Sequence, residues 1–350
     1  MRIAIVNDVP IAAEALRRAV LSRGEYEIAW VAHDGAEAVA QCLSDTPDLI
    51  LMDLIMPRMN GVQATREIMT RCPCAILVVT CSVNENARMV FEAMGVGALD
   101  AVDTPSPSEG NFEKVSEPLL QKLDSMQGLL GLKERRKPCA AAEPPPGKRE
   151  TQPPLVVIGA SAGGPSALAE VLGKLPPQFP SPIVIVQHVD EQFAASLASW
   201  LKGQTALKVR VAVEGDVPTP GEVLLAGRSE HLVMIGSRRL GYCCEPKEAF
   251  YLPSVDVFFE SVACRWRGPV IGVILTGMGR DGAKGLKRLR DAGFHTIAQN
   301  RETCAVYGMP KAAFEEGAAV EVLPLSDISA ALCKRCSAAS KPVPHLPEPL

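Results

Sequence analysis

The amino-acid sequence predicts an α/β protein of two domains, each built on a doubly wound, mostly parallel sheet. In both halves of the chain, short apolar runs alternate with segments of helical periodicity. Between the halves, residues 138–154 contain six prolines, a composition typical of an extended linker that does not join a core. A chain of 350 residues is long enough for two separate hydrophobic cores.

Composition and charge exclude several classes of function. A net charge of -4 argues against a nucleic-acid-binding surface. No apolar run approaches the roughly 20 residues of a membrane span, so no direct membrane insertion is expected. The N-terminus lacks the pattern of a signal peptide, and eleven cysteines, an odd number, favour reduced thiols in the cytoplasm. The Cys72–Cys74 and Cys333–Cys336 pairs each lack the second pair that a zinc site usually has.

The first 125 residues contain five strand candidates. They lie at residues 3–6, 28–32, 49–52, 76–79 and 98–102. Helical spacing marks residues 11–21, 35–43 and 87–94, and a last helix at 115–130. The alternation predicts a parallel sheet with helices on both faces.

Polar side chains stand at the carboxyl ends of three of these strands. Asp8 follows the first strand, Asp53 the third and Thr80 the fourth. In a doubly wound sheet these strand ends converge on one crevice. Two carboxylates there suit Mg²⁺, which keeps water and phosphate oxygens as its other ligands. We therefore expect Asp53 to accept a phosphoryl group, with the Thr80 hydroxyl within reach.

The second half alternates in the same way. Strand candidates lie at residues 155–158, 183–186, 208–213, 222–225, 232–235, 270–275 and 296–298. Helix candidates lie at residues 165–175, 192–202, 255–266, 283–291, 309–315 and 327–333. Closely spaced strands between residues 208 and 244 predict an antiparallel excursion from the parallel sheet.

Three residues of this half could form a hydrolytic triad. Ser161 follows the strand at 155–158 in a glycine-rich turn, His188 follows the second strand, and Asp281 lies in a glycine-rich turn after residues 270–275. A serine nucleophile needs a base, and the base needs an acid that fixes its tautomer. Asp281 could also cap the helix at 283–291. None of the other histidines, His33, His231, His295 and His345, stands beside a glycine-rich turn at a strand end.

Other interpretations of the glycine turns are weaker. Residues 159–163 match the GxSxG elbow of α/β-hydrolases, but there the acid precedes the histidine, whereas here His188 precedes Asp281. Residues 277–282 match a GxGxxG dinucleotide turn, with Glu302 at a suitable distance, but Asp281 inside the turn would repel a pyrophosphate. Neither turn ends in the Gly-Lys-Ser/Thr of a phosphate-binding P-loop.

Residues 1–125 resemble the receiver domain of two-component response regulators. The resemblance rests on Asp8, on Asp53-Leu54-Ile55-Met56-Pro57 with Asn60-Gly61, on Thr80 and on Gly97-Ala98. It implies a flavodoxin-like fold, phosphorylation at Asp53 by a histidine kinase, Mg²⁺ bound by Asp8 and Asp53, and Thr80 as the switch hydroxyl. Two positions depart from the family pattern: Asn7 replaces a usual acid and Thr104 a usual lysine.

Residues 154 to about 335 resemble the catalytic domain of the chemotaxis protein-glutamate methylesterases. The matching motifs are Ile158-Gly159-Ala160-Ser161 with Gly163-Gly164-Pro165, Gln187-His188, and Leu275-Thr276-Gly277-Met278-Gly279 with Asp281-Gly282-Ala283 and Gly285. The resemblance implies Ser161 as nucleophile, His188 as general base and Asp281 as its partner, with no cofactor for the esterase. Ala162 stands where the family often has threonine. We expect the N–H of Met278 to hold the oxyanion.

The expected domains are a receiver at 1–125, a linker at 126–153, a catalytic domain at 154–338 and a disordered tail at 339–350. The resemblance implies phosphorylation-regulated hydrolysis of glutamate methyl esters, and deamidation of glutamines, on the cytoplasmic part of methyl-accepting chemoreceptors. The alternative is a phosphorylation-gated regulator that binds receptor or kinase without catalysis. A DNA-binding response regulator is disfavoured because the second half contains no recognisable helix-turn-helix.

Overall fold

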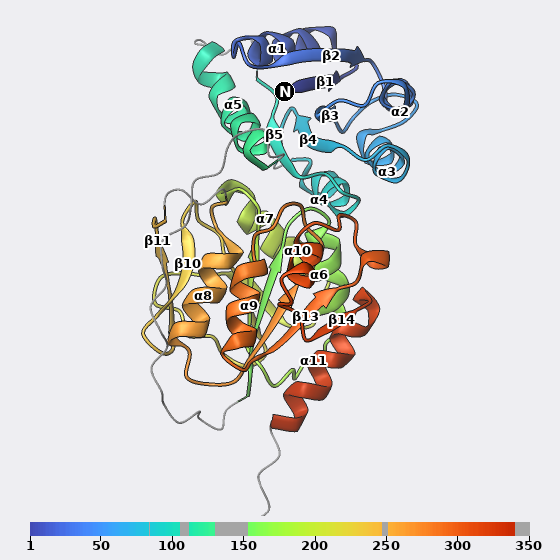
Figure 1. Cartoon of the computed structure of the whole chain (residues 1–350). Helices are drawn as coiled ribbons and strands as arrows, with labels where there is room; N and C mark the ends of the chain where they lie inside the picture. The colour runs from blue at the N-terminus through green and yellow to red at the C-terminus, as the bar shows by residue number, and fades with distance from the viewer. Residues whose placement is uncertain (84, 106–111, 130–152, 247–250, 340–350) are drawn as a thin grey trace, which may run out of the picture.

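The chain is described by a computed structural model that covers residues 1–83, 85–105, 112–129, 153–246 and 251–339. Two α/β units follow one another along the chain (Figure 1). No helix in these ranges is both long enough and apolar enough to cross a membrane. The predicted fold class is confirmed by both sheets.

The N-terminal unit is a five-stranded parallel sheet in the order β2-β1-β3-β4-β5, the flavodoxin-like order. Its strands are β1 Arg2–Val6, β2 Glu27–Ala32, β3 Leu49–Asp53, β4 Ala75–Thr80 and β5 Asp100–Asp103. Its helices are α1 Pro10–Leu21, α2 Gly35–Ser44, α3 Gly61–Arg71, α4 Ala87–Gly95 and α5 Phe112–Leu129. β3 and β4 are buried almost throughout, as their continuous apolar runs require in a sheet covered on both faces.

The C-terminal unit contains a seven-stranded parallel sheet in the order β14-β13-β12-β6-β7-β9-β8. Its strands are β6 Leu155–Ala160, β7 Ile183–Gln187, β8 Lys208–Val211, β9 Glu222–Leu225, β12 Val270–Ile274, β13 His295–Gln299 and β14 Glu321–Leu323. A separate antiparallel pair consists of β10 His231–Ile235 and β11 Arg239–Cys243. The helices are α6 Gly164–Gly173, α7 Glu191–Lys202, α8 Val255–Arg265, α9 Ala283–Asp291, α10 Met309–Glu315 and α11 Leu325–Ala339, with a short 3₁₀ helix η1 at Arg301–Thr303.

Alternating residues of β6 enter the two cores of this unit. Val156 and Ile158 pack in the core that includes α6, α7 and α11, whereas Leu155 and Val157 pack in the core that includes α8 and α9. The strand is therefore apolar along its whole length, and its first polar side chain, Ser161, comes after it ends. This burial on both faces fixes where the serine leaves the sheet.

The structure differs from the sequence prediction in some elements. β8 and β9 pair in parallel within the main sheet, so the expected antiparallel excursion is wrong for them and is limited to β10 and β11. β11 and β14 had no predicted counterpart, since both are short and only partly buried. Helix α5 continues to Leu129, inside the expected linker, and α11 to Ala339; residues 130–152 and 340–350 lie outside the described residues.

The two units are in contact through helix α4, which packs against α6 and α7 (Figure 1). The ring of Phe91 on α4 lies 5.7 Å from that of Trp200 on α7, measured between centroids. Gly95 also lies tightly against α6, since a Cβ there would come within 1.9 Å of the Ser166 Oγ. The receiver-like unit therefore meets the second unit on the helices that follow β6 and β7.

Candidate active site

Ser161 and His188 leave the sheet side by side. β6 and β7 pair in parallel with Ala160 opposite Gln187, and the two candidate residues come directly after this pair. The backbone N–H of His188 donates to the carbonyl of Ala160 at 3.0 Å. The convergence expected at the carboxyl ends of parallel strands is present here.

His188 is paired with Asp281, as expected from the sequence. Its Nε2 lies 2.7 Å from the Asp281 Oδ2, and both side chains are nearly buried. The other ring nitrogen, Nδ1, is buried and has no hydrogen-bond partner among the described residues. If Nε2 carries the proton that Asp281 accepts, Nδ1 is an available acceptor for a hydroxyl proton.

Asp281 is held by the N-terminus of helix α8. Its carboxylate accepts hydrogen bonds from the Ser254 Oγ at 2.8 Å, the Val255 N–H at 2.7 Å and the Asp256 N–H at 3.0 Å. Burial favours the neutral acid, but the hydrogen bond and charge of His188 and these backbone donors together lower the pKa of Asp281. The carboxylate is therefore the stable form beside the imidazole.

The sequence suggested that Asp281 caps α9, but in the structure it accepts hydrogen bonds from the start of another helix. Gly282 is the N-cap of α9, and Asp281 instead meets the start of α8. Ser254, the N-cap of α8, was not identified from the sequence. A serine before an apolar helix signals a helix start, but nothing in the sequence says which carboxylate that start faces. His231 supports this turn, because its Nδ1 accepts from the Ser254 N–H at 3.1 Å.

Tyr251 is a second residue that the sequence analysis missed. Its ring stacks on the imidazole of His188 with a centroid separation of 3.6 Å and an interplanar angle of 12°. The Tyr251 hydroxyl donates to the carbonyl of Met278 at 3.3 Å. The residue belongs to none of the motifs and lies at no strand end, so neither pattern could have identified it.

The Ser161 turn is fixed by its backbone. The Ser161 N–H donates to the Thr276 carbonyl at 3.1 Å, and the Gln187 Nε2 donates to the Ser161 carbonyl at 2.9 Å. Ser161 is only 4 % exposed. Its hydroxyl makes no hydrogen bond to His188 in this structure, because the His188 Nε2 is paired with Asp281 and the Nδ1 has no partner among the described residues. The three candidate residues are thus gathered at one sheet edge, with the acid–base pair formed and the serine–base bond unformed.

The Gly277–Met278 turn lies against the serine. A Cβ on Gly277 would come within 2.8 Å of the Ser161 Cβ and 2.3 Å of the Met309 Sδ, so only glycine fits. The Gly277 carbonyl accepts from the N–H groups of Gly308 at 3.0 Å and Met309 at 2.8 Å. Because a trans peptide points its N–H opposite to its C=O, the Met278 N–H is directed away from α10.

The receiver-like unit covers the turn that contains Ser161. The Gly163 N–H, two residues after Ser161, donates to the carbonyl of Met94 on α4 at 2.6 Å. Ala162 is fully buried in the core cluster of the N-terminal unit, and Met278 packs against the same cluster. The residues that follow Ser161 are therefore packed against the N-terminal unit.

A second candidate site lies at the carboxyl ends of β1 and β3. The Asn7 Nδ2 donates to the Asp53 Oδ2 at 3.1 Å, and the Leu54 N–H donates to the Asp53 Oδ1 at 2.7 Å. Burial and the charge of Asp8 raise the pKa of Asp53 to about 6, against the opposing backbone donors. One buried oxygen of Asp8, Oδ1, has no partner among the described atoms.

This arrangement fits the expected Mg²⁺ site in part. Two adjacent carboxylates and a free carboxylate oxygen are suitable ligands for a hard cation that keeps several waters. The Asn7 amide nitrogen faces Asp53 and is a donor, so this group cannot act as a ligand in that orientation. No group of three or more His, Cys, Asp or Glu side chains with metal-binding geometry is present in the described ranges.

Thr80 and Thr104 lie on neighbouring chain segments. The Thr80 Oγ1 accepts from the Nδ2 of Asn86, the residue that precedes α4, at 2.9 Å. The Thr104 N–H donates to the Thr80 carbonyl at 2.8 Å. Thr104 holds the position of the family's usual lysine, and its described contact with this site is through its backbone N–H.

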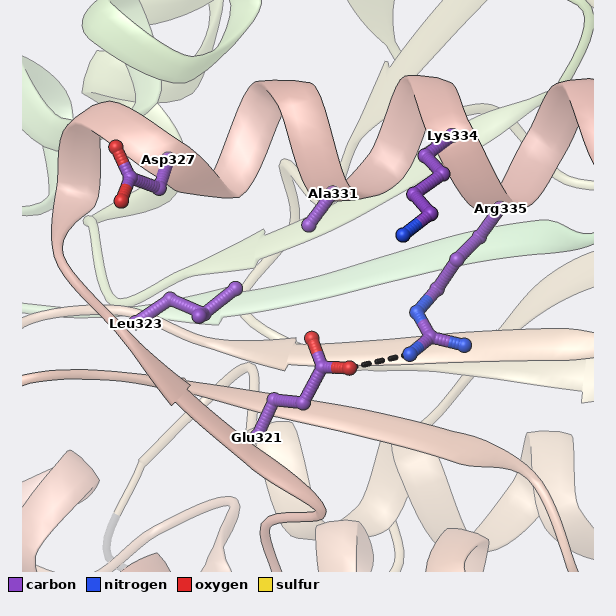
Figure 2. Close-up of a pocket in the computed structure, with 6 residues that line it drawn as sticks. All are labelled: Glu321, Leu323, Asp327, Ala331, Lys334 and Arg335. Carbon is purple, nitrogen blue, oxygen red and sulfur yellow. Dashed lines mark hydrogen bonds and ion pairs between the residues drawn. The ribbon is translucent and has the colours of Figure 1, made fainter.

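A surface groove of about 550 Å³ lies elsewhere, between β14 and α11 (Figure 2). It is lined by Glu321, Leu323, Asp327, Ala331, Lys334 and Arg335. Arg335 forms an ion pair with Glu321 across it, and none of the candidate residues lines it. The groove is therefore separate from both candidate sites.

Two family models match separate parts of the chain. A family model described as CheB methylesterase matches residues 156–332, and one described as response regulator receiver domain matches residues 3–114. Protein-glutamate methylesterase/protein-glutamine glutaminase 3 of Pseudomonas aeruginosa is 52% identical over 334 residues, covering 95% of this chain and 99% of that protein. Protein-glutamate methylesterase/protein-glutamine glutaminase 4 of Burkholderia thailandensis is 55% identical over 329 residues, with coverages of 94% and 96%.

One solved structure resembles the C-terminal unit. The crystal structure of the Thermotoga maritima CheB methylesterase catalytic domain matches with a TM-score of 0.51 and 38% sequence identity. The match covers 52% of this chain and 98% of that chain.

Proposed function

The chain belongs to the CheB methylesterase family, and we propose that Ser161, His188 and Asp281 carry out its hydrolytic reaction on chemoreceptors. It is a protein-glutamate methylesterase and protein-glutamine glutaminase whose receiver domain makes the activity responsive to phosphorylation. The observation that supports the proposed triad best is the His188–Asp281 pair at 2.7 Å, with the second imidazole nitrogen free beside the end of the Ser161 strand.

The reaction proceeds through an acyl-enzyme. The Nδ1 of His188 takes the proton of the Ser161 hydroxyl while Oγ attacks the γ-carbonyl carbon of a glutamate methyl ester. The Met278 N–H stabilises the oxyanion. The C–O bond to the methoxy group breaks, and His188 returns the proton to give methanol. Water, deprotonated by His188, then releases glutamate and restores Ser161. A glutamine side chain follows the same course and loses ammonia.

Asp281 and its supports act on the base. A carboxylate at Nε2 keeps the proton on that nitrogen and stabilises the imidazolium that forms during the attack. The three donors from the start of α8 keep Asp281 ionised and in position. No cofactor is needed for these proton transfers.

Regulation is exerted through the receiver. A histidine kinase supplies the phosphoryl group to Asp53. Asp8 and Asp53 would hold Mg²⁺, which offsets the negative charge that gathers on the phosphoryl oxygens. In the unphosphorylated chain, α4 covers the Ser161 turn through the Gly163–Met94 hydrogen bond. Phosphorylation at Asp53 weakens this contact and opens the site to a receptor helix.

The test measures methanol release from methyl-labelled chemoreceptor membranes by the full chain with Mg²⁺ and acetyl phosphate. We expect Ser161→Ala to lower turnover by about 10⁴-fold, and His188→Gln to have a similar effect. Ser326→Ala, at an exposed serine on α11, is the matched control and should retain wild-type turnover.

Two results would contradict the proposal. Wild-type turnover in Ser161→Ala would exclude the serine as nucleophile. A wild-type chain that binds receptor after phosphorylation but releases no methanol would instead favour the non-catalytic regulator.

A further inference from the structure

One segment of the chain holds both members of the acid–base pair. Residues 254–256 supply the three donors to Asp281, and Tyr251, three residues earlier, stacks on His188. The hydroxyl of the same tyrosine donates to the carbonyl of Met278, in the glycine turn that faces Ser161. Tyr251 therefore contacts the base and the turn at once.

The contacts of His188 show what the stack adds. A hydrogen bond from Nε2 to Asp281 fixes the position of one ring atom, but it leaves the ring plane free to tilt about that bond. The Tyr251 ring is stacked on the imidazole, with an angle of 12° between the two ring planes and 3.6 Å between their centroids, and so restricts the tilt. The unpaired Nδ1 needs this restriction, because its direction decides whether it can receive the Ser161 proton.

We propose that Tyr251 is a positioning residue for the esterase reaction: its ring sets the plane of the His188 imidazole, and its hydroxyl ties that plane to the Met278 turn. The inference rests on the proposed function, in which His188 is the base. An aromatic face against the ring also favours the imidazolium that forms when Ser161 attacks.

Tyr251 does not act as an acid or a nucleophile. Burial, together with the charge of Asp281, raises the pKa of its phenol above the ordinary value. The hydroxyl therefore keeps its proton at physiological pH and remains a hydrogen-bond donor to Met278. Its contribution lies in geometry rather than in proton transfer.

Two variants of the full chain separate the ring from the bulk of the side chain. Tyr251→Phe keeps the ring and loses the hydroxyl, whereas Tyr251→Leu keeps apolar volume and loses the ring. With Mg²⁺ and acetyl phosphate, we expect Tyr251→Leu to lower kcat for methanol release by roughly 10- to 100-fold with KM within about twofold. Tyr251→Phe should retain kcat within about threefold.

A structural measurement tests the positioning independently of activity. The imidazole protons of His188, assigned by their loss in His188→Gln, should be shifted upfield by the tyrosine ring in proton NMR spectra. The shift should persist in Tyr251→Phe and disappear in Tyr251→Leu.

The outcomes distinguish this inference from the proposed function. Three results would each overturn the role of Tyr251. These are an equal kcat in the Leu and Phe variants, a change in KM alone, and His188 resonances that are unchanged by Tyr251→Leu. If the wild-type chain itself releases no methanol, the proposed function fails, and the NMR comparison still decides whether Tyr251 fixes the imidazole.

Discussion

At the scale of single residues, the site depends on buried groups whose charge is set by a few neighbours. Asp281 is kept ionised by His188 and by the start of α8, although burial opposes the charge. Asp53 accepts hydrogen bonds from the Asn7 amide and the Leu54 backbone N–H, while burial and the charge of Asp8 oppose its ionisation. The two carboxylates therefore respond to pH in opposite ways.

The raised pKa of Asp53, about 6, predicts that ionisation of this carboxyl lowers the folding stability of the metal-free protein. The folded state holds this proton more tightly than the unfolded state, so stability falls as pH rises from about 4 to about 6. Asp53→Asn removes the titration. At pH 7.5 we expect the free energy of unfolding of the variant to exceed that of wild type by about 1–2 kcal/mol, after allowance for partial solvent screening. Below pH 4 the difference should be lost.

Urea unfolding at several pH values, with chelator present, measures this difference. Glu67→Gln, which removes an exposed carboxylate on α3, is the matched control and should show little pH dependence relative to wild type. A constant difference between Asp53→Asn and wild type across this range would show that Asp53 titrates normally.

At the scale of elements, α4 joins the two sites. Its N-terminal neighbour Asn86 donates to the Thr80 hydroxyl, and the carbonyl of Met94 in its last turn accepts from Gly163. If α4 moves as a rigid body over this length, a shift at Thr80 would be transmitted to the Ser161 turn. If phosphorylation draws the Thr80 hydroxyl toward Asp53, the Asn86 bond is lost.

Thr80→Val tests this connection, because valine keeps the shape of threonine and removes the hydroxyl. We expect Asp53 to be phosphorylated by acetyl phosphate within about threefold of the wild-type rate, while most of the stimulation of methanol release is lost. Thr70→Val, at an exposed threonine on α3, should leave both quantities unchanged. Full stimulation in Thr80→Val would show that the signal does not pass through this hydroxyl.

The same elements show what sequence could predict and why. Strand ends predicted that Ser161, His188 and Asp281 would lie near one another, because the carboxyl ends of neighbouring parallel strands must meet. Ser254 and Tyr251 were missed because they lie in a segment with no recognisable motif. Their contacts with Asp281 and His188 are made between residues far apart in the sequence. β8 and β9 were misassigned because strand spacing alone does not distinguish a parallel pair from an antiparallel one.

At the scale of the whole molecule, the closed arrangement depends on contacts that neither unit makes alone. An apolar contact joins Phe91 on α4 to Trp200 on α7, and a backbone hydrogen bond joins Met94 to Gly163. A third contact is ionic: the Lys122 ammonium on α5 pairs with Asp100 in its own unit and lies 3.4 Å from Asp190 in the other. Asp190 caps α7, two residues after His188.

Removal of the Lys122–Asp190 contact should most directly change the balance between closed and open forms. Its side chain is 12 % exposed, and burial disfavours its charge, but Asp100 and Asp190 outweigh this and raise the pKa of Lys122. Lys122→Met keeps the length of the side chain and leaves Asp190 without its cation. Loss of about 1.4 kcal/mol from the closed form alone would raise methanol release by the unphosphorylated chain roughly tenfold.

Lys114→Met, at an exposed lysine of the same helix, should leave this basal rate unchanged. If phosphorylation already separates Lys122 from Asp190, the phosphorylated rates of both variants should match wild type. An unchanged basal rate in Lys122→Met would mean that the apolar contact and the Gly163 hydrogen bond keep the site closed without the ion pair.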